Sequence, residues 1–63
     1  MKHVVQVGES TRSIAARYGI LPRDLVQANP NKPYQFSRNE PVFSDLEEGE
    51  ELIIPIEDER NSP

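Results

Sequence analysis

The chain has 63 residues, no cysteine and a formal net charge of −4 at pH 7. This length allows one domain at most and buries only about 60% of the surface that the unfolded chain exposes, so we expect marginal stability. The missing cysteines exclude disulfides and thiolate metal sites. The acidic balance argues against nucleic acid and anionic lipid as partners. No apolar run approaches the roughly 20 residues that a membrane-spanning helix needs.

A β-strand is predicted near the start of the chain, over residues 3–7, because its three valines follow a period of two. Gly8 ends this strand. Ser10 or Thr11 is then expected to cap a helix, since either hydroxyl can accept a hydrogen bond from a free amide of the first turn. Gly19 ends the helix, because glycine readily takes the left-handed conformation found at helix C-termini. The apolar face of this helix consists of Ile14, Ala15 and Tyr18.

A second helix is predicted to begin at Leu21-Pro22, since proline suits the first helical turn. Asn29-Pro30 ends it, because a proline disfavours the helical conformation of the residue before it. A second strand is predicted over residues 50–56, with Leu52 and Ile54 on the same face.

The least regular part of the chain lies between residues 32 and 45. We predict a long loop there, with a turn at residues 37–40 and with Val42 and Phe43 returning to the core. A loop of this length in a small domain is usually functional or disordered, and its aromatic residues argue against disorder. The final residues, 57–63, are polar and unpatterned and are predicted to form a tail or linker.

Taken in order, these motifs resemble the LysM (lysin motif) domain. The resemblance implies an α+β fold in the order βααβ, with both helices packed on one face of a two-stranded antiparallel sheet. The domain is expected to span residues 1–56, with 32–45 as an insertion loop between the second helix and the second strand. Thr11 departs from the family, which usually has an apolar residue there. The motifs that carry the resemblance are Gly8-Glu9-Ser10, Ser13-Ile14-Ala15, Tyr18-Gly19, Leu25, Asn29-Pro30, Gly49 and Leu52-Ile53-Ile54-Pro55.

The resemblance also implies a non-catalytic carbohydrate-binding module for N-acetylglucosamine-containing glycans, peptidoglycan or chitin, that anchors an attached protein to the cell wall. In the family, the sugar groove lies between the loop after the first strand and the loop after the second helix. Ile14 or Pro30 is expected to line the pocket for the acetamide methyl group. Carried over to this chain, the ligand-binding residues are Gly8, Glu9, Ser10, Thr11, Arg12, Ala28, Asn29, Pro30 and Asn31, with Tyr34 as a stacking residue.

Several of these residues have an equally simple structural interpretation. Ser10 and Thr11 are needed as helix caps whether or not sugar binds. Asn29 suits a helix end, where its side chain can bond to nearby backbone. Among the aromatic residues, Tyr34 and Phe36 are better placed to stack on a sugar, although Phe36 can equally hold the loop in place.

Catalysis is not expected. His3 is the only histidine, and we predict that it fills a half-buried position in the first strand. The acidic run at residues 47–51 does not provide the two carboxylates, about 5 to 10 Å apart across a cleft, that glycosidases use. We interpret this run as a solvated edge that discourages strand association. No cofactor and no metal site are expected.

A second hypothesis is a LysM-like assembly protein of a phage tail or contractile injection baseplate, which would bind protein rather than sugar. No signal peptide is apparent, and this fits a component made in the cytoplasm. A module of a larger exported protein would instead be associated with the cell wall. In either case we expect the isolated domain to be monomeric, and we favour glycan binding.

Overall fold

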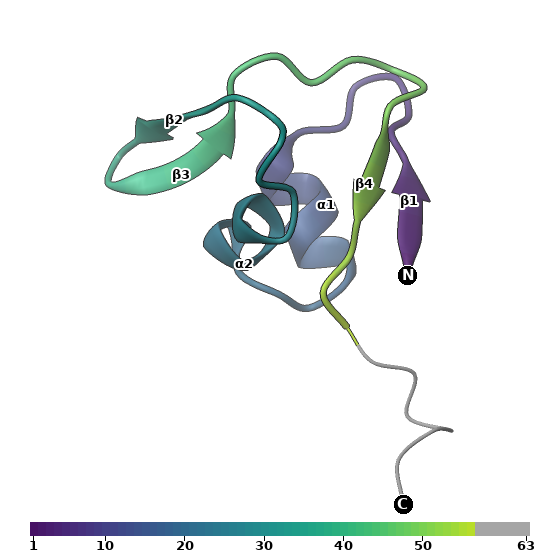
Figure 1. Cartoon of the computed structure of the whole chain (residues 1–63), viewed down its shortest axis with the longest axis horizontal. Helices are drawn as coiled ribbons and strands as arrows, with labels where there is room; N and C mark the ends of the chain where they lie inside the picture. Colours follow the sequence, from purple (N-terminus) through teal and green to yellow (C-terminus); the bar gives the residue numbers. More distant parts are fainter. Residues whose placement is uncertain (57–63) are drawn as a thin grey trace, which may run out of the picture.

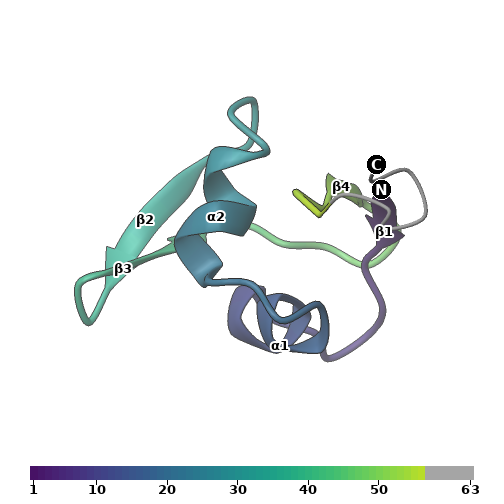
Figure 2. The same ribbon diagram turned by 90° about the horizontal axis from the view of Figure 1, so that it is seen from below.

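The computed structural model describes residues 1–56 and shows a core LysM-like arrangement with an added hairpin (Figure 1). Seen from below, the sheet that joins the two ends of this region lies to one side of the two helices, and the hairpin lies on the opposite side (Figure 2). The α+β fold with two helices and a two-stranded antiparallel sheet is therefore confirmed. The predicted tail at 57–63 lies outside the described residues. The elements are β1 (Lys2–Val4), α1 (Thr11–Arg17), α2 (Pro22–Gln27), β2 (Tyr34–Ser37), β3 (Glu40–Phe43) and β4 (Glu51–Ile53).

Strands β1 and β4 pair antiparallel, so the two ends of the domain meet as expected. His3 lies opposite Leu52 in the register. The Val5 N–H donates to the Glu50 carbonyl (2.9 Å), which continues the pairing beyond the short strands. Both strands are shorter than predicted: β1 ends at Val4, and Val7 is exposed in the turn that precedes α1. The predicted alternation in the second strand is confirmed, since Leu52 is buried and its neighbour Ile53 is exposed.

The core lies between this sheet and the two helices. It is a single cluster of buried apolar side chains, to which Tyr18, Ile20 and Leu46 add partly buried surface. Burial of a Val, Leu or Ile side chain contributes about 1.5–3 kcal/mol, so a core of this size agrees with the marginal stability expected from length. The buried apolar residues are Val5, Ile14, Ala15, Leu25, Val26, Phe43, Leu52 and Ile54.

Helix α1 begins and ends where the sequence predicts. Of the two candidate caps, Ser10 is the N-cap: its hydroxyl accepts from the Ser13 N–H (3.1 Å), while the Ser10 N–H donates to the Ser13 hydroxyl (2.8 Å). Gly19 has φ of +69°, and the Ile20 N–H donates back to the Ala15 carbonyl at 3.0 Å. This is the left-handed helix ending that the Tyr-Gly pair indicates.

The prediction of a long irregular loop over residues 32–45 is wrong at its centre. Strands β2 and β3 form a hairpin there, with Tyr34 opposite Phe43 and Phe36 opposite Pro41. The predicted turn at 37–40 is confirmed: Arg38 and Asn39 have φ of +54° and +66°, and two-residue hairpin turns of this kind match the twist of the flanking strands. Phe43 returns to the core as predicted.

Replacing Gly19 with alanine tests the helix ending. A Cβ at this position would meet no atom within 4 Å, so the substitution adds no clash and its effect is that of the left-handed backbone. We expect Gly19→Ala to lower the free energy of unfolding by about 1–2 kcal/mol. Gly19→Asn is the matched control and should lose less, because asparagine tolerates this conformation. Urea unfolding followed by circular dichroism measures both; equal losses would contradict the explanation.

Candidate functional site

The residues predicted to form one groove are distributed over separate hollows. The first, which we call the α1 hollow, has a volume of about 290 Å³ and contains four of the predicted residues. The loop after α2 does not contribute to it; the other wall comes from the hairpin and from Leu46. Gly8 is absent from its lining. The α1 hollow is lined by Glu9, Ser10, Thr11, Arg12, Ser37, Val42, Phe43 and Leu46.

The predicted residues of the second loop, Ala28 to Asn31, lie along another hollow beside β4. Tyr34 faces a third hollow, which it shares with Pro30. The reason for the separation is the hairpin: it leaves the end of α2 and its strand β3 contacts both helices. The connection from α2 to β4 therefore approaches the start of α1 through β3 and Leu46 rather than through Ala28–Asn31.

Two consecutive residues of α1 attach the hairpin. The Phe43 N–H donates to the Thr11 hydroxyl (3.0 Å), and Thr11 is only 4% exposed. The Arg12 guanidinium donates through Nε to the Glu40 carboxylate (2.5 Å) and through Nη2 to the Ser37 carbonyl (3.2 Å). Thr11, where the family resemblance implies an apolar residue, thus uses its hydroxyl as an acceptor for the hairpin backbone.

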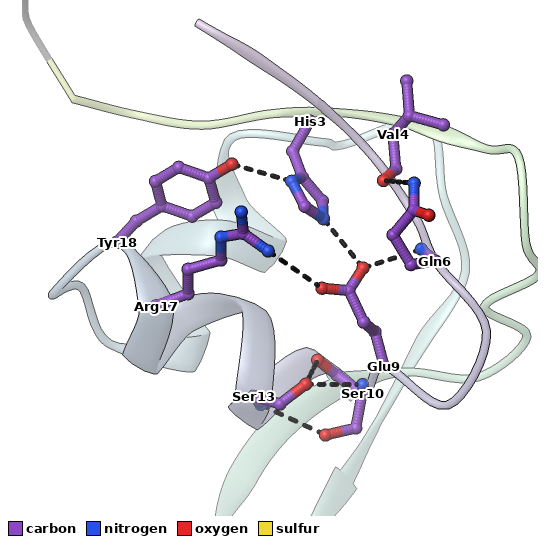
Figure 3. A network of polar contacts seen from close by, with 8 residues as sticks. All are labelled: His3, Val4, Gln6, Glu9, Ser10, Ser13, Arg17 and Tyr18. Atoms are coloured by element: carbon purple, nitrogen blue, oxygen red, sulfur yellow. Dashed lines mark hydrogen bonds and ion pairs between the residues drawn. The ribbon is translucent and has the colours of Figure 1, made fainter.

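Glu9 is the centre of a polar network beneath the loop after β1 (Figure 3). Its Oε1 accepts from His3 Nε2 (2.8 Å) and from the Gln6 N–H (2.7 Å), and its Oε2 lies 3.8 Å from the Arg17 guanidinium. The hydrogen bond from His3 and the backbone hydrogen bond from Gln6 hold the pKa of the Glu9 carboxyl below its ordinary value. Glu9 therefore stabilises the loop after β1 through its bonds to His3 and Gln6, and it also lines the α1 hollow.

His3 is more deeply buried than the predicted half-buried position. Its Nε2 lies 2.8 Å from Glu9 Oε1, and its Nδ1 lies 2.7 Å from the Tyr18 hydroxyl. Both ring nitrogens are thus occupied within the fold. Across residues 1–56, the structure has no group of three His, Asp or Glu side chains that could hold a metal ion, and no helix there is long and apolar enough to cross a membrane.

Asn29 connects the end of α2 to β4. Its side-chain Nδ2 donates to the Leu25 carbonyl (2.8 Å) and the Ile53 carbonyl (3.0 Å), and its Oδ1 accepts from the Ile53 N–H (2.8 Å). Asn29 is 6% exposed. The Asn29 amide therefore bonds to backbone groups, as the structural interpretation of this residue predicts. One of them, the Leu25 carbonyl, lies within the end of the helix, and the others belong to Ile53 of β4.

Glu50, from the acidic run at 47–51, is held in place by two contacts. It accepts from Lys32 Nζ (2.8 Å) and from the Glu47 N–H (2.6 Å). The hydrogen bond from Lys32, followed by that from the Glu47 backbone, lowers the pKa of the Glu50 carboxyl. The run is thus not only a solvated edge, because Glu50 ties the connection after α2 to the start of β4.

The α1 hollow combines polar groups and apolar wall in the way that small-molecule sites do. The Ser10 and Thr11 hydroxyls each accept one backbone hydrogen bond, which leaves their protons to donate. The N–H groups at the start of a helix have no acceptor within the helix. The apolar wall differs from the prediction, because Ile14 is fully buried and Pro30 lies elsewhere. Val42, Phe43 and Leu46 provide it instead.

Sequence reasoning did not assign Ser37, Val42, Phe43 or Leu46 to the site. Val42 and Phe43 were predicted only to return to the core. The four residues before the Arg38-Asn39 turn, 34–37, alternate between aromatic and polar side chains, whereas the four residues after it do so less regularly. Alternation of this kind beside a turn indicates a β-hairpin. Which face of the hairpin meets α1 depends on the contacts of Thr11 and Arg12, which are tertiary.

The structure is that of a small α+β domain with a hollow at the start of α1. The family model for the LysM domain matches residues 3–34, just over half of the 63-residue chain, and the chain belongs to this family. LysM domains are in general binding modules for N-acetylglucosamine-containing glycans and are typically non-catalytic. Neither the curated proteins nor the solved structures contain a significant match to the chain.

Removing the Asn29 side chain tests its part in the fold. We expect Asn29→Ala to lower the free energy of unfolding by about 1–3 kcal/mol, because the buried Leu25 carbonyl and the part-buried N–H and carbonyl of Ile53 lose their partner. The matched control is Asn31→Ala at an exposed position of the same loop, which should change stability by less than about 0.5 kcal/mol. Urea unfolding measures both; an Asn29→Ala domain as stable as the control would contradict this role.

The lowered pKa values of Glu9 and Glu50 predict acid sensitivity. Both carboxyls bind protons less readily in the folded than in the unfolded chain, so unfolding takes up protons in acid. The stabilisation is complete above the unfolded-state value, about 4.3 for glutamate, and is lost as the pH falls through the lower folded-state pKa. We expect Glu9→Gln to be less stable at pH 7 and to lose less on acidification to pH 3.

Thermal unfolding between pH 3 and pH 7 measures this effect. Glu48→Gln is the control, because it removes one exposed carboxylate without touching the contacts of Glu9 or Glu50. If the melting temperature of Glu9→Gln falls with pH as steeply as that of the control, the contacts of Glu9 are not the cause of the acid sensitivity.

Proposed function

We propose that this chain is a non-catalytic carbohydrate-binding module whose ligand is an N-acetylglucosamine polymer, peptidoglycan or chitin. Its biological role would be to anchor an attached protein to the cell wall. The observation that supports the proposal most directly is the α1 hollow, which lies at Glu9–Arg12, on the first of the two loops where the family resemblance implies a sugar groove.

The chemistry of the hollow suits an N-acetylated pyranose. The acetamide carbonyl needs a donor, and the first-turn N–H groups of Thr11 and Arg12 are of the right kind. The Ser10 hydroxyl is a partner for a sugar hydroxyl. The acetamide methyl needs apolar surface, which Val42 and Leu46 offer at the opposite wall. A neutral, amphipathic sugar thus matches both sides of the hollow.

The charges around the hollow are compensated within the fold. Glu40 pairs with Arg12, and Glu9 bonds to His3 and lies near Arg17. Although the chain has a net negative charge, the carboxylates of Glu9 and Glu40 are therefore both paired, and a neutral glycan can bind there without facing an unpaired carboxylate. One such module is expected to bind weakly, and tandem copies would gain through effective concentration.

An amide-shift NMR titration with N-acetylglucosamine pentamer tests the proposal. We expect saturable shifts at Glu9–Arg12, Ser37 and Leu46, because these residues line the hollow. Cellopentaose, which has the same backbone linkage but no acetamide groups, is the control ligand and should produce no saturable shifts there. If neither glycan shifts these amides at millimolar concentration, the proposal fails and the assembly-protein hypothesis gains.

A variant pair adds a test within the chain. Val42→Ser removes apolar wall from the hollow and should weaken binding of the pentamer about tenfold, the effect of losing one buried apolar side chain. Val7→Ser makes the same chemical change at an exposed position that does not line the hollow and should leave the affinity unchanged. Equal affinities of the two variants would argue against the hollow as the site.

A further inference from the structure

The outer part of the hairpin borders the third hollow, at Tyr34 and Pro30, which we call the hairpin hollow. It lies between the end of α2 and one face of the β2–β3 hairpin and has a volume of about 340 Å³. Tyr34 and Phe36 occupy alternate positions of β2 and so share this face. The lining residues are Val26, Gln27, Pro30, Tyr34, Phe36 and Pro41.

The two aromatic rings of the hairpin hollow are exposed. Tyr34 is 53% and Phe36 is 68% exposed, and their rings meet edge to face with centroids 5.9 Å apart. Neither ring is needed to hold the hairpin, because Phe43 enters the core and Thr11 and Arg12 provide the polar contacts. Exposed, contiguous aromatic surface beside a hollow is typical of a recognition site.

The charge of the lining limits the ligand. None of the six lining residues is charged, although the chain has seven basic and eleven acidic residues. Complementarity therefore favours a neutral ligand over a phosphate, an anionic lipid or a charged peptide. The polar groups present are the Gln27 amide and the Tyr34 hydroxyl, which can bond at the edge of a ligand that rests on the rings.

We propose that the hairpin hollow is a second carbohydrate-contact site, in which Phe36 and Tyr34 stack on the apolar C–H face of a neutral N-acetylated pyranose. A pyranose ring presents apolar C–H groups on its faces and hydroxyls at its rim, and this matches aromatic surface flanked by an amide and a hydroxyl. The choice of sugar rests on the proposed function. The location does not: the hairpin hollow and the α1 hollow share no lining residue.

The test is the pentamer titration repeated on Phe36→Ala and on a matched control, Leu21→Ala, which removes an exposed apolar side chain away from both hollows. In the unmodified chain we expect a second set of shifts at Gln27, Tyr34 and Phe36, with upfield ring-current shifts of sugar C–H protons. Phe36→Ala should weaken this set about tenfold and leave the shifts at Glu9–Arg12 unchanged. Leu21→Ala should leave both sets unchanged.

The outcomes separate this inference from the proposed function. Shifts confined to Glu9–Arg12 would overturn the second site and leave the proposed function intact. Shifts confined to the hairpin face would support the second site and remove the α1 hollow as the binding site. A proline-rich peptide is titrated in parallel, and hairpin shifts with that peptide but not with sugar would overturn the assignment to carbohydrate. Dispersed amide spectra of both variants verify that they fold.

Discussion

The sheet of this domain depends on a pairing between chain ends that is only three residues long on each side. Two short strands far apart in the sequence have little stability of their own, because closing the chain between them loses entropy before the pairing is gained. Asn29 supplies what a neighbouring strand would otherwise provide. Its amide bonds to the N–H and the carbonyl of Ile53, which places the end of α2 against the free edge of β4.

The hairpin is added to this arrangement without replacing any part of it. It departs after Lys32 and returns before Glu50, and the Lys32–Glu50 contact joins the segments on its two sides next to β4. Its attachment to α1 consists of Phe43 in the core and of the polar contacts of Thr11 and Arg12. Because Phe43 is the only one of its aromatic residues that is buried, the remaining aromatic surface faces solvent.

The parts of the fold that the sequence predicts are those with local causes. Ser10 with Ser13, Gly19, and Asn29-Pro30 each determine a helix end through groups within a few residues. The hairpin was missed because its turn is Arg38-Asn39, which lacks the Asn-Gly or Asp-Gly pair that marks such turns. The composition of the α1 hollow was predicted on one side only, since its other wall is brought there by contacts between residues more than 20 positions apart.

The register of the hairpin decides which side chains belong to which hollow. Successive residues of a strand point to opposite faces, so Ser37 and Val42 line the α1 hollow while Phe36 and Pro41 line the hairpin hollow. Phe43, at the end of β3, is the exception, because it lies opposite Tyr34 and yet lines the α1 hollow. A slip by one residue would exchange the two faces and turn Tyr34 and Phe36 away from the hairpin hollow. The hydrogen bond from Phe43 to Thr11 and the pair between Arg12 and Glu40 both act on β3 and oppose such a slip. The two α1 residues that border the first hollow thereby also determine that the aromatic face of the hairpin lies beside α2.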